Sequence, residues 1–411
     1  MAELAIKGGT KIAEELNKVQ WPRLYPQDEA AVVDALRKNY WGGLGDDNLP
    51  NRIFEREFSK YHDARYGVTV ANGTLTLELS LKSGGINPGD EVLVPAITFV
   101  ASASAIVSVG ALPVFVDVDP YTCQISAAAI EESITPKTRG IVVVHYGGYV
   151  ADLDAILPIA EKYNLVVVED CAHAQGSSWR GKKVGSWGTF GSFSFQHSKA
   201  LSAGEGGIVL TNDEKLYERA ILMMNIGRKQ GQTQYDHFLS ASNWRMGGLQ
   251  AALLLSQFGR FPEEAKERNR NGAFLAKELN RIPGIKALKQ DSRITHRGYY
   301  FMIVDFDEEI FGCSRAKFVE ALRAEGVVNV SRGYGRPIYK EPAFAEKNLR
   351  PLLHEKIELP DYNGMNLPNA EKWASRQVTI FHSYLLGDGT ETNLFLEAVM
   401  KVKENVDELV D

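Results

Sequence analysis

Short apolar runs, rich in valine and isoleucine, mark the chain between residues 92 and 168: Val92–Val94, Val114–Val116, Ile141–Val144 and Leu165–Val168. Because they do not alternate with polar residues, these runs are typical of strands buried on both faces of a parallel sheet. Ala151–Tyr163 lies between the last two runs and has its apolar residues at helical spacing. This strand–helix–strand pattern predicts an α/β fold.

The pattern changes near residue 262. A helix at Gly247–Gln257 precedes this point. The elements expected after it are a helix, a strand, a second helix capped by Ser314 and a second strand: Glu263–Leu279, Tyr299–Asp305, Ser314–Glu325 and Val327–Val330. We predict a large domain at residues 1–261 and a smaller C-terminal α+β domain at residues 262–411.

Composition narrows the function classes. The 411 residues include 46 Lys and Arg against 52 Asp and Glu, so the formal charge is −6, and 44% of the residues are hydrophobic. This balance argues against disorder and against a protein that mainly binds nucleic acid, which needs a basic surface. The cysteines Cys123, Cys171 and Cys313 are odd in number and far apart. They favour a reducing, cytoplasmic location without disulfides or a metal site.

A membrane span is the alternative for the segment Val92–Val116, which carries no charge and is long enough to cross a bilayer. Pro95, Gly110 and Pro113 interrupt it. We therefore predict a strand, a short helix and a strand in a soluble core, with no membrane contact.

Lys199 and Asp170 are the candidate chemical groups. Lys199 lies in SFSFQHSKALSAGEGG (Ser192–Gly207), and Asp170 ends the valine-rich run of LVVVEDCAHAQG (Leu165–Gly176). Ligands of open α/β sheets bind outside the carboxyl ends of the strands. An ion pair, a surface lysine or a helix cap would be the ordinary explanations. Pyridoxal phosphate is the alternative, since it needs a lysine amine, an acid for its ring nitrogen and donors for its phosphate.

The order and spacing of several motifs resemble the DegT/StrS family of pyridoxal-phosphate aminotransferases. The motifs are LAIKGGT (Leu4–Thr10), WP (Trp21–Pro22), ANGT (Ala71–Thr74), GDEVLVPAITFVASASAI (Gly89–Ile106), PVFVDVDP (Pro113–Pro120), EDCAHAQG, SFSFQHSKALSAGEGG and SNWRMGGLQAA (Ser242–Ala252). The resemblance covers nearly the whole chain. It implies the aspartate-aminotransferase-like (fold-type I) architecture, in which a large domain with a mostly parallel sheet is followed by the smaller domain.

The resemblance also implies roles for individual residues. Lys199 matches the lysine that forms the Schiff base and moves the proton, and Asp170 matches the acid that keeps the pyridine nitrogen protonated. Phe99 matches the aromatic residue that stacks on the ring, although a core phenylalanine is the alternative. The expected cofactor is pyridoxal 5'-phosphate, with pyridoxamine 5'-phosphate as its intermediate form.

Phosphate contacts are implied at Thr74 with the amides of Gly73 and Leu75, at Ser194, and at Asn243. This role decides between two structures for Thr74–Lys82, whose strict alternation predicts a strand. We predict a helix, because its first amides could then face the phosphate. Asn243 matches a residue that reaches over from a neighbouring subunit, which implies a homodimer with shared sites. A helix N-cap is the alternative for Asn243.

His173 points to one branch of the family. Many members have glutamine there, and histidine resembles the branch of glutamine:scyllo-inosose aminotransferases and aminohydroxybenzoate synthases. FHSYLLG (Phe381–Gly387) replaces a Pro-His-Pro-like stretch and favours the same branch. The implied reaction moves an amino group from glutamine or glutamate to a keto group on a cyclitol or on a sugar, including a nucleotide-linked one.

Substrate contacts are expected from Trp41, in the loop Trp41–Asp46, and from arginines that could bind a carboxylate, with surface ion pairs as the alternative: Arg245, Arg332 and Arg336. Two other functions compete. A pyridoxamine-phosphate-dependent sugar dehydratase is disfavoured, since those relatives lack the lysine that is present here as Lys199. A cofactor-bound regulator is the second, although the acidic charge argues against DNA binding.

Overall fold

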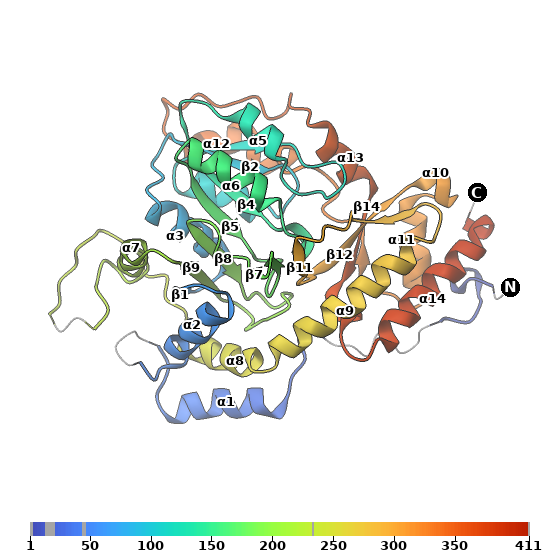
Figure 1. The fold of residues 1–411 in the computed structure, drawn as a ribbon, viewed down its shortest axis with the longest axis horizontal. Helices are drawn as coiled ribbons and strands as arrows, with labels where there is room; N and C mark the ends of the chain where they lie inside the picture. Colours follow the sequence, from blue (N-terminus) through green and yellow to red (C-terminus); the bar gives the residue numbers. More distant parts are fainter. Residues whose placement is uncertain (1–2, 13–20, 43–46, 232–233, 410–411) are drawn as a thin grey trace.

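The computed structural model describes residues 3–12, 21–42, 47–231 and 234–409. Its largest sheet has the strand order β1-β9-β8-β5-β4-β2-β3. In chain order these strands are β1 (Tyr66–Val70), β2 (Glu91–Pro95), β3 (Leu112–Val116), β4 (Thr138–Val144), β5 (Val166–Asp170), β8 (Phe190–Ser194) and β9 (Gly207–Thr211). In the order β3-β2-β4-β5-β8, each strand pairs in parallel with the next. Strand β9 is antiparallel to β8, and β1 is antiparallel to β9. The predicted α/β fold class is therefore confirmed (Figure 1).

Both faces of this sheet are buried, as the uninterrupted apolar runs predict. Val92 and Val94 of β2 enter one hydrophobic core, and Leu93 between them enters another. The helices around the sheet are α1 (Pro26–Arg37), α2 (Pro50–Tyr61), α3 (Gly73–Ser83), α4 (Ala101–Ser108), α5 (Ala127–Ser133), α6 (Leu153–Lys162), α7 (Glu214–Met224) and α8 (Gly248–Phe258). The uncharged stretch Val92–Val116 is β2, α4 and β3. No helix in the described ranges is both long and apolar enough to cross a membrane.

The helix predicted from Thr74 is confirmed as α3, and Asn72 caps it by accepting a hydrogen bond from the Leu75 amide at 3.0 Å. Its strand-like alternation has a physical reason. The helix is covered by β8, β9, α4 and α7, so small polar residues such as Thr76 and Ser80 are buried along with the leucines. The Ser80 hydroxyl donates to the Thr76 carbonyl within the helix, which allows this burial.

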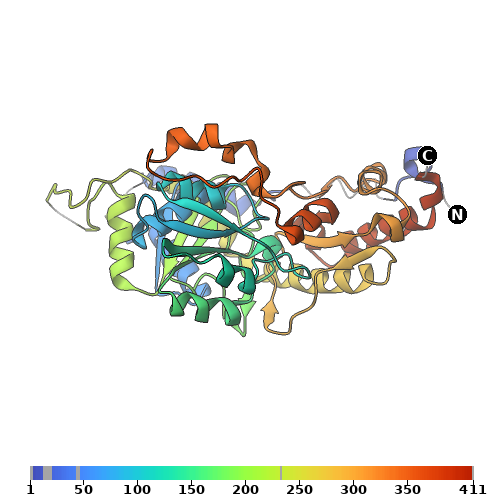
Figure 2. The same cartoon turned by 90° about the horizontal axis from the view of Figure 1, so that it is seen from above.

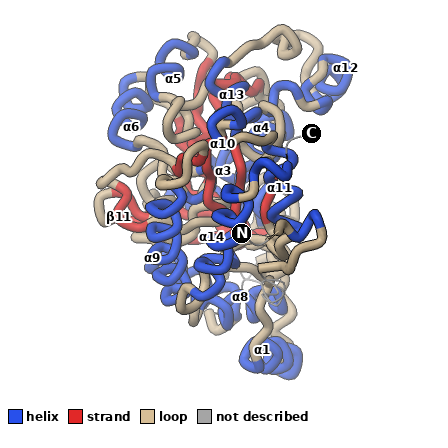
Figure 3. The backbone as a smooth tube through the Cα atoms, turned by 90° about the vertical axis from the view of Figure 1, so that its right-hand side faces the viewer, coloured by secondary structure: helices blue, strands red, loops and turns tan. Residues whose placement is uncertain are grey.

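The C-terminal half has a second sheet in the order β10-β12-β14-β13. Its elements are α9 (Phe261–Leu279), β10 (Ile285–Ala287), β12 (Phe301–Phe306), α10 (Glu308–Phe311), α11 (Arg315–Ala324), β13 (Val330–Ser331), β14 (Gln377–Phe381) and α14 (Thr390–Glu404). Figure 3 shows α9, α11 and α14 grouped on this side of the molecule. Three short strands form a third sheet: β6 (Ser178–Trp179), β7 (Lys182–Lys183) and β11 (Ile294–His296).

Ser314 caps α11 as predicted, by accepting a hydrogen bond from the Lys317 amide at 3.2 Å. The strand predicted at Val327–Val330 is wrong except for its last residue. Gly326 adopts φ +100°, and the Val327 amide donates to the Leu322 carbonyl. Val327 therefore belongs to the C-terminal cap of the helix, and the strand begins only at Val330.

Each half of the chain contributes a segment that packs against the core of the other half. Residues 338–374, with α12 (Glu346–Leu349) and most of α13 (Pro368–Arg376), return to the first sheet, where Phe344 packs against Phe115. Figure 2 shows this orange segment lying over the blue-green part of the chain. Leu4 instead joins the C-terminal core, and Glu325 accepts from the amides of Ala5 and Ile12. The domain boundary at residue 262 stays a prediction.

Acid should destabilise this fold through His62. The side chain is fully buried, its Nδ1 donates to the Val184 carbonyl at 2.9 Å and its Nε2 accepts from the Gly176 amide. Burial lowers the pKa of His62 to about 3. The unfolded chain binds a proton near pH ~6.5. Below that pH the free energy of unfolding should therefore fall, by at most about 1.4 kcal/mol per pH unit, until the pH reaches the folded pKa.

Urea unfolding at several pH values between 7 and 4 measures this effect. His62→Gln should be less stable than the wild type at pH 7 but should lose less stability on acidification. Equal slopes for the two proteins would contradict the assignment.

Candidate active site

A cavity of about 680 Å³ opens at the carboxyl ends of the parallel strands. Its lining includes residues that end or follow β1, β2, β5 and β8, together with two tyrosines of the C-terminal half: Gly73, Thr74, Leu75, Phe99, Asp170, His173, Ser194, Lys199, Tyr300 and Tyr334. An α/β sheet places its ligand site at this edge. The structure therefore brings the predicted Lys199 and Asp170 to one cavity.

Asp170 is the last residue of β5 and is 6% exposed. Its Oδ2 accepts a hydrogen bond from the Ser102 hydroxyl at 2.8 Å, and its Oδ1 accepts from the Ala172 amide at 3.1 Å. Burial raises the pKa of Asp170, and these hydrogen bonds and the charge of Lys199 oppose the increase without cancelling it. A cation placed in the cavity would therefore stabilise the carboxylate.

The Lys199 amine is also buried, and the residue is 9% exposed. Its Nζ lies 4.2 Å from the centre of the Tyr300 ring. Burial lowers the pKa of Lys199 to about 8, although Asp170 acts in the opposite direction. A lysine with this pKa is partly unprotonated near neutral pH, so its amine can act as a nucleophile or a base.

His173 stacks on Tyr300, with 4.4 Å between the ring centroids and 23° between the planes. Its Nδ1 accepts a hydrogen bond from the Gly147 amide at 3.4 Å, and burial lowers its pKa well below the usual value. The ring is therefore neutral and carries its proton on Nε2. The position predicted for a cofactor contact thus lies in the cavity wall beside Lys199.

The N-terminus of α3 and Ser194 both line the cavity. A Cβ atom at Gly73 would lie 2.4 Å from the Ser194 Cβ, so only glycine allows these segments to approach so closely. The Leu75 amide donates to the Asn72 side chain. The amides of Gly73 and Thr74 belong to the first turn of the helix, where backbone N–H groups have no acceptor within the helix. Phe99 lies at the cavity and is 52% exposed, so it is not a core phenylalanine.

Other predicted residues do not line this cavity in the described single chain. The exposed Asn243 accepts from the Arg245 amide, and Gly247 occupies the N-cap of α8, so the alternative role of Asn243 as a helix cap is wrong. The Arg245 guanidinium donates to Asn225 Oδ1 at 2.8 Å. Arg332 is exposed, and Arg336 pairs with Glu341 at 3.2 Å.

Trp41 is 64% exposed, and residues 43–46 of its loop lie outside the described ranges. Substrate contacts from Trp41, Arg245 and Arg332 stay predictions.

The sequence reasoning missed Ser102 and Tyr300. Ser102 follows Phe99 by three residues within the segment Gly89–Ile106, so one helical turn could have linked the two positions. Tyr300 comes from the C-terminal half, about a hundred residues after Lys199, and no local pattern connects them.

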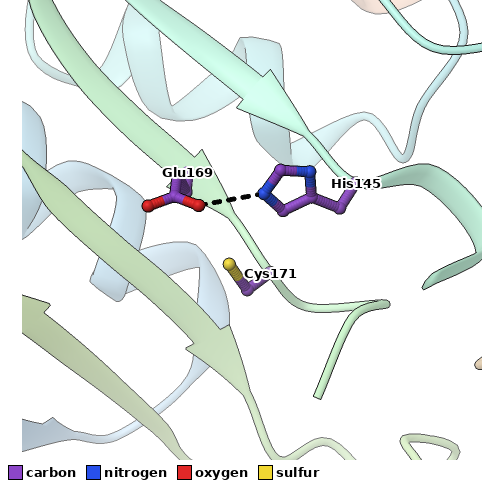
Figure 4. Close-up of side chains that lie close together, drawn as sticks. All are labelled: His145, Glu169 and Cys171. Atoms are coloured by element: carbon purple, nitrogen blue, oxygen red, sulfur yellow. Dashed lines mark hydrogen bonds and ion pairs between the residues drawn. The ribbon is translucent and has the colours of Figure 1, made fainter. Parts of the chain in front are cut away.

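Beside the cavity, His145, Glu169 and Cys171 form a buried group with metal-ligand chemistry (Figure 4). The Glu169 carboxylate already accepts from His145 Nε2 at 3.1 Å and from the amides of Gly185, Trp187 and Gly188. His145 Nδ1 accepts from the Ala151 amide at 3.2 Å. Because the ring nitrogens of His145 and the carboxylate of Glu169 already make these hydrogen bonds, the two side chains hold the ends of β4 and β5 together.

The chain matches the model of the DegT/DnrJ/EryC1/StrS aminotransferase family over residues 24–392. It therefore belongs to this family and is an aminotransferase by class.

It is 36% identical to L-glutamine:2-deoxy-scyllo-inosose aminotransferase of Streptoalloteichus tenebrarius, over 99% of both chains. It is 38% identical to the protein named "Putative L-glutamine:3-amino-2,3-dideoxy-scyllo-inosose aminotransferase" of the same organism, over 99% of both chains. The crystal structure of 3-amino-5-hydroxybenzoic acid synthase superposes with a TM-score of 0.84 at 31% identity, covering 95% of this chain and 98% of that one. The predicted branch of the family and the fold-type I architecture are confirmed.

The acid–base properties of Lys199 can be measured directly. In cofactor-free protein, reductive methylation of Lys199 should be half-maximal near pH 8, whereas ordinary lysines have a pKa of about 10.4. Asp170→Asn should move the midpoint lower, because the negative charge of Asp170 raises the pKa of the amine. Peptide mass spectrometry follows the labelling. A wild-type midpoint near the ordinary value, or a rise in the variant, would contradict the arrangement.

Proposed function

We propose that this aminotransferase uses pyridoxal 5'-phosphate to move an amino group from glutamine to a keto group on a cyclitol ring. The observation that carries the proposal is that Lys199 and Asp170 line one cavity at the carboxyl edge of the sheet. The names of the relatives support glutamine as the donor and a keto-inositol as the acceptor.

The residues of the cavity fit this cofactor. Lys199 would bind its aldehyde carbon, Asp170 its ring nitrogen, and Ser194 with the first turn of α3 its phosphate, while the exposed ring of Phe99 is available to stack. The close approach that Gly73 permits to Ser194 supports the phosphate assignment, because it brings a hydroxyl to the helix N-terminus. When bound, the cofactor supplies a ring that withdraws electrons from the carbon bearing the nitrogen.

The side chains of this chain would do the remaining chemistry. Lys199 holds and moves the proton at its Nζ, because its lowered pKa lets the amine both accept and donate a proton near neutral pH. Asp170 carries the negative charge that keeps a ring nitrogen cationic, and Ser102 orients its carboxylate. His173 is held neutral, so its Nε2–H can donate to a ring oxygen without adding charge.

A homodimer is the proposed assembly. Asn243 is exposed and lies outside the cavity of its own chain, which supports a role toward the cavity of a second copy. Each site would then be completed only when two chains associate.

Amino transfer tests the proposal. Protein loaded with pyridoxal phosphate should convert glutamine and 2-deoxy-scyllo-inosose into the amino-cyclitol, detected by mass spectrometry, and nucleotide-linked keto sugars should react poorly. Asp170→Asn should lower the rate about 10²-fold or more, since it removes the negative charge that would keep the ring nitrogen of the cofactor cationic.

Asp34→Asn is the matched control, because Asp34 pairs with Lys38 on the exposed surface, where ion pairs contribute little. A preference for nucleotide-linked sugars would refute the cyclitol assignment. A cofactor absorbance band that no amino donor changes would instead favour a sensor.

The shared site predicts complementation between inactive variants. Asn243→Ala and Lys199→Ala homodimers should each have little activity. Mixed under conditions of subunit exchange, they should form hybrid dimers in which one of the two sites has both residues intact, so activity should reappear. Mass spectrometry of intact dimers would verify the exchange. No recovery in verified hybrids would show that each chain builds its site alone.

A further inference from the structure

Side chains from distant segments of the sequence donate hydrogen bonds to the backbone of the loop that carries Lys199. Residues 198–201 lie outside helices and strands, so their carbonyls need other donors. Three consecutive carbonyls accept such bonds: Ser198 from His382 Nε2 at 3.1 Å, Lys199 from Trp21 Nε1 at 3.1 Å, and Ala200 from Arg268 Nη2 at 3.3 Å. The donors come from the N-terminal segment, from α9 and from the turn after β14.

The three donors also contact one another. The rings of Trp21 and His382 meet edge to face with 4.5 Å between their centroids, and the Arg268 guanidinium lies 5.3 Å from the centre of the Trp21 ring. Arg268 and His382 are fully buried, and Glu264 pairs with Arg268 at 3.2 Å. Trp21 and His382 belong to the WP and FHSYLLG motifs, to which the proposed chemistry assigns no role. None of the three donors is among the described residues that line the cavity.

We propose that this Trp21–Arg268–His382 cluster is a positioning device for Lys199. By fixing the main chain on both sides of the lysine and at the lysine itself, the cluster sets where a long, rotatable side chain places its amine. On the cavity side, the Ser198 hydroxyl bonds to the Tyr300 hydroxyl at 2.7 Å, so the loop is held from both directions. Displacing a reacting group by about 1 Å can cost up to ~10²-fold in rate. The inference rests on the proposed role of Lys199.

Trp21→Phe tests the device in the full chain loaded with pyridoxal phosphate, because it keeps a ring but removes the donor to the Lys199 carbonyl. The rate of the single-turnover reaction with glutamine should fall about three- to tenfold, as expected for one lost hydrogen bond. The glutamine concentration at half-maximal rate should change less than about twofold, because the cluster touches no substrate. The pH midpoint of the visible absorbance band should also shift, because the Lys199 nitrogen would move to a different environment.

Trp373→Phe is the matched control. Trp373 is buried, and its indole also donates to a backbone carbonyl, that of Asp119 at 3.2 Å, in a part of the fold that does not line the cavity. This variant should keep the wild-type rate and the wild-type pH midpoint. His382→Phe, which removes the donor to the Ser198 carbonyl, should reproduce the Trp21→Phe result and carries the test if Trp21→Phe does not fold.

The outcomes separate the two proposals. If the wild type forms the visible band and reacts with glutamine, but Trp21→Phe and His382→Phe behave like Trp373→Phe, the positioning role is overturned and the role of Lys199 stands. If the wild-type protein forms no such band, the proposed function fails, and with it the basis for this inference.

Discussion

The buried carboxylate of Asp170 is the constraint on which the site depends. Moving a charged group out of water is costly unless hydrogen bonds or an opposite charge compensate for it. Ser102 and the Ala172 amide provide part of that compensation, and the raised pKa of Asp170 shows that it is incomplete. The same burial lowers the pKa of Lys199 to about 8. An acid that favours a cation and an amine that readily gives up its proton therefore face one cavity, which suits the chemistry of an aminotransferase.

Distant segments of the chain must meet to build this cavity. Asp170 and Ser194 are the last residues of strands in the first sheet, whereas Tyr300 directly precedes β12 of the second sheet. Gly148, at φ +79°, makes this contact possible, because a Cβ there would lie 2.5 Å from the Tyr299 nitrogen. The backbone before Tyr300 can thus pass close to His173, and the two rings stack. The wall of the site is therefore set by the packing of the two halves.

The strands were predictable because a strand buried on both faces has an uninterrupted run of apolar residues, such as the valines of β4 and β5. The position of Asp170 at the cavity followed from the same rule, since it ends a buried strand. The strand at Val327–Val330 was mispredicted because an apolar residue that closes a helix cap has the same local pattern as the start of a strand. Tyr300 and the Trp21–Arg268–His382 cluster could not be predicted, because their partners are far away in the sequence and only tertiary packing brings them together.

The most direct measurement tests whether pyridoxal phosphate attaches to Lys199. The protein is incubated with pyridoxal phosphate, reduced with borohydride and digested, and the modified peptide is identified by mass spectrometry. The cofactor should be found on Lys199, with the other lysines unmodified at comparable occupancy. Stable attachment to a different lysine, or no attachment although the protein transfers amino groups, would contradict the assignment of the site.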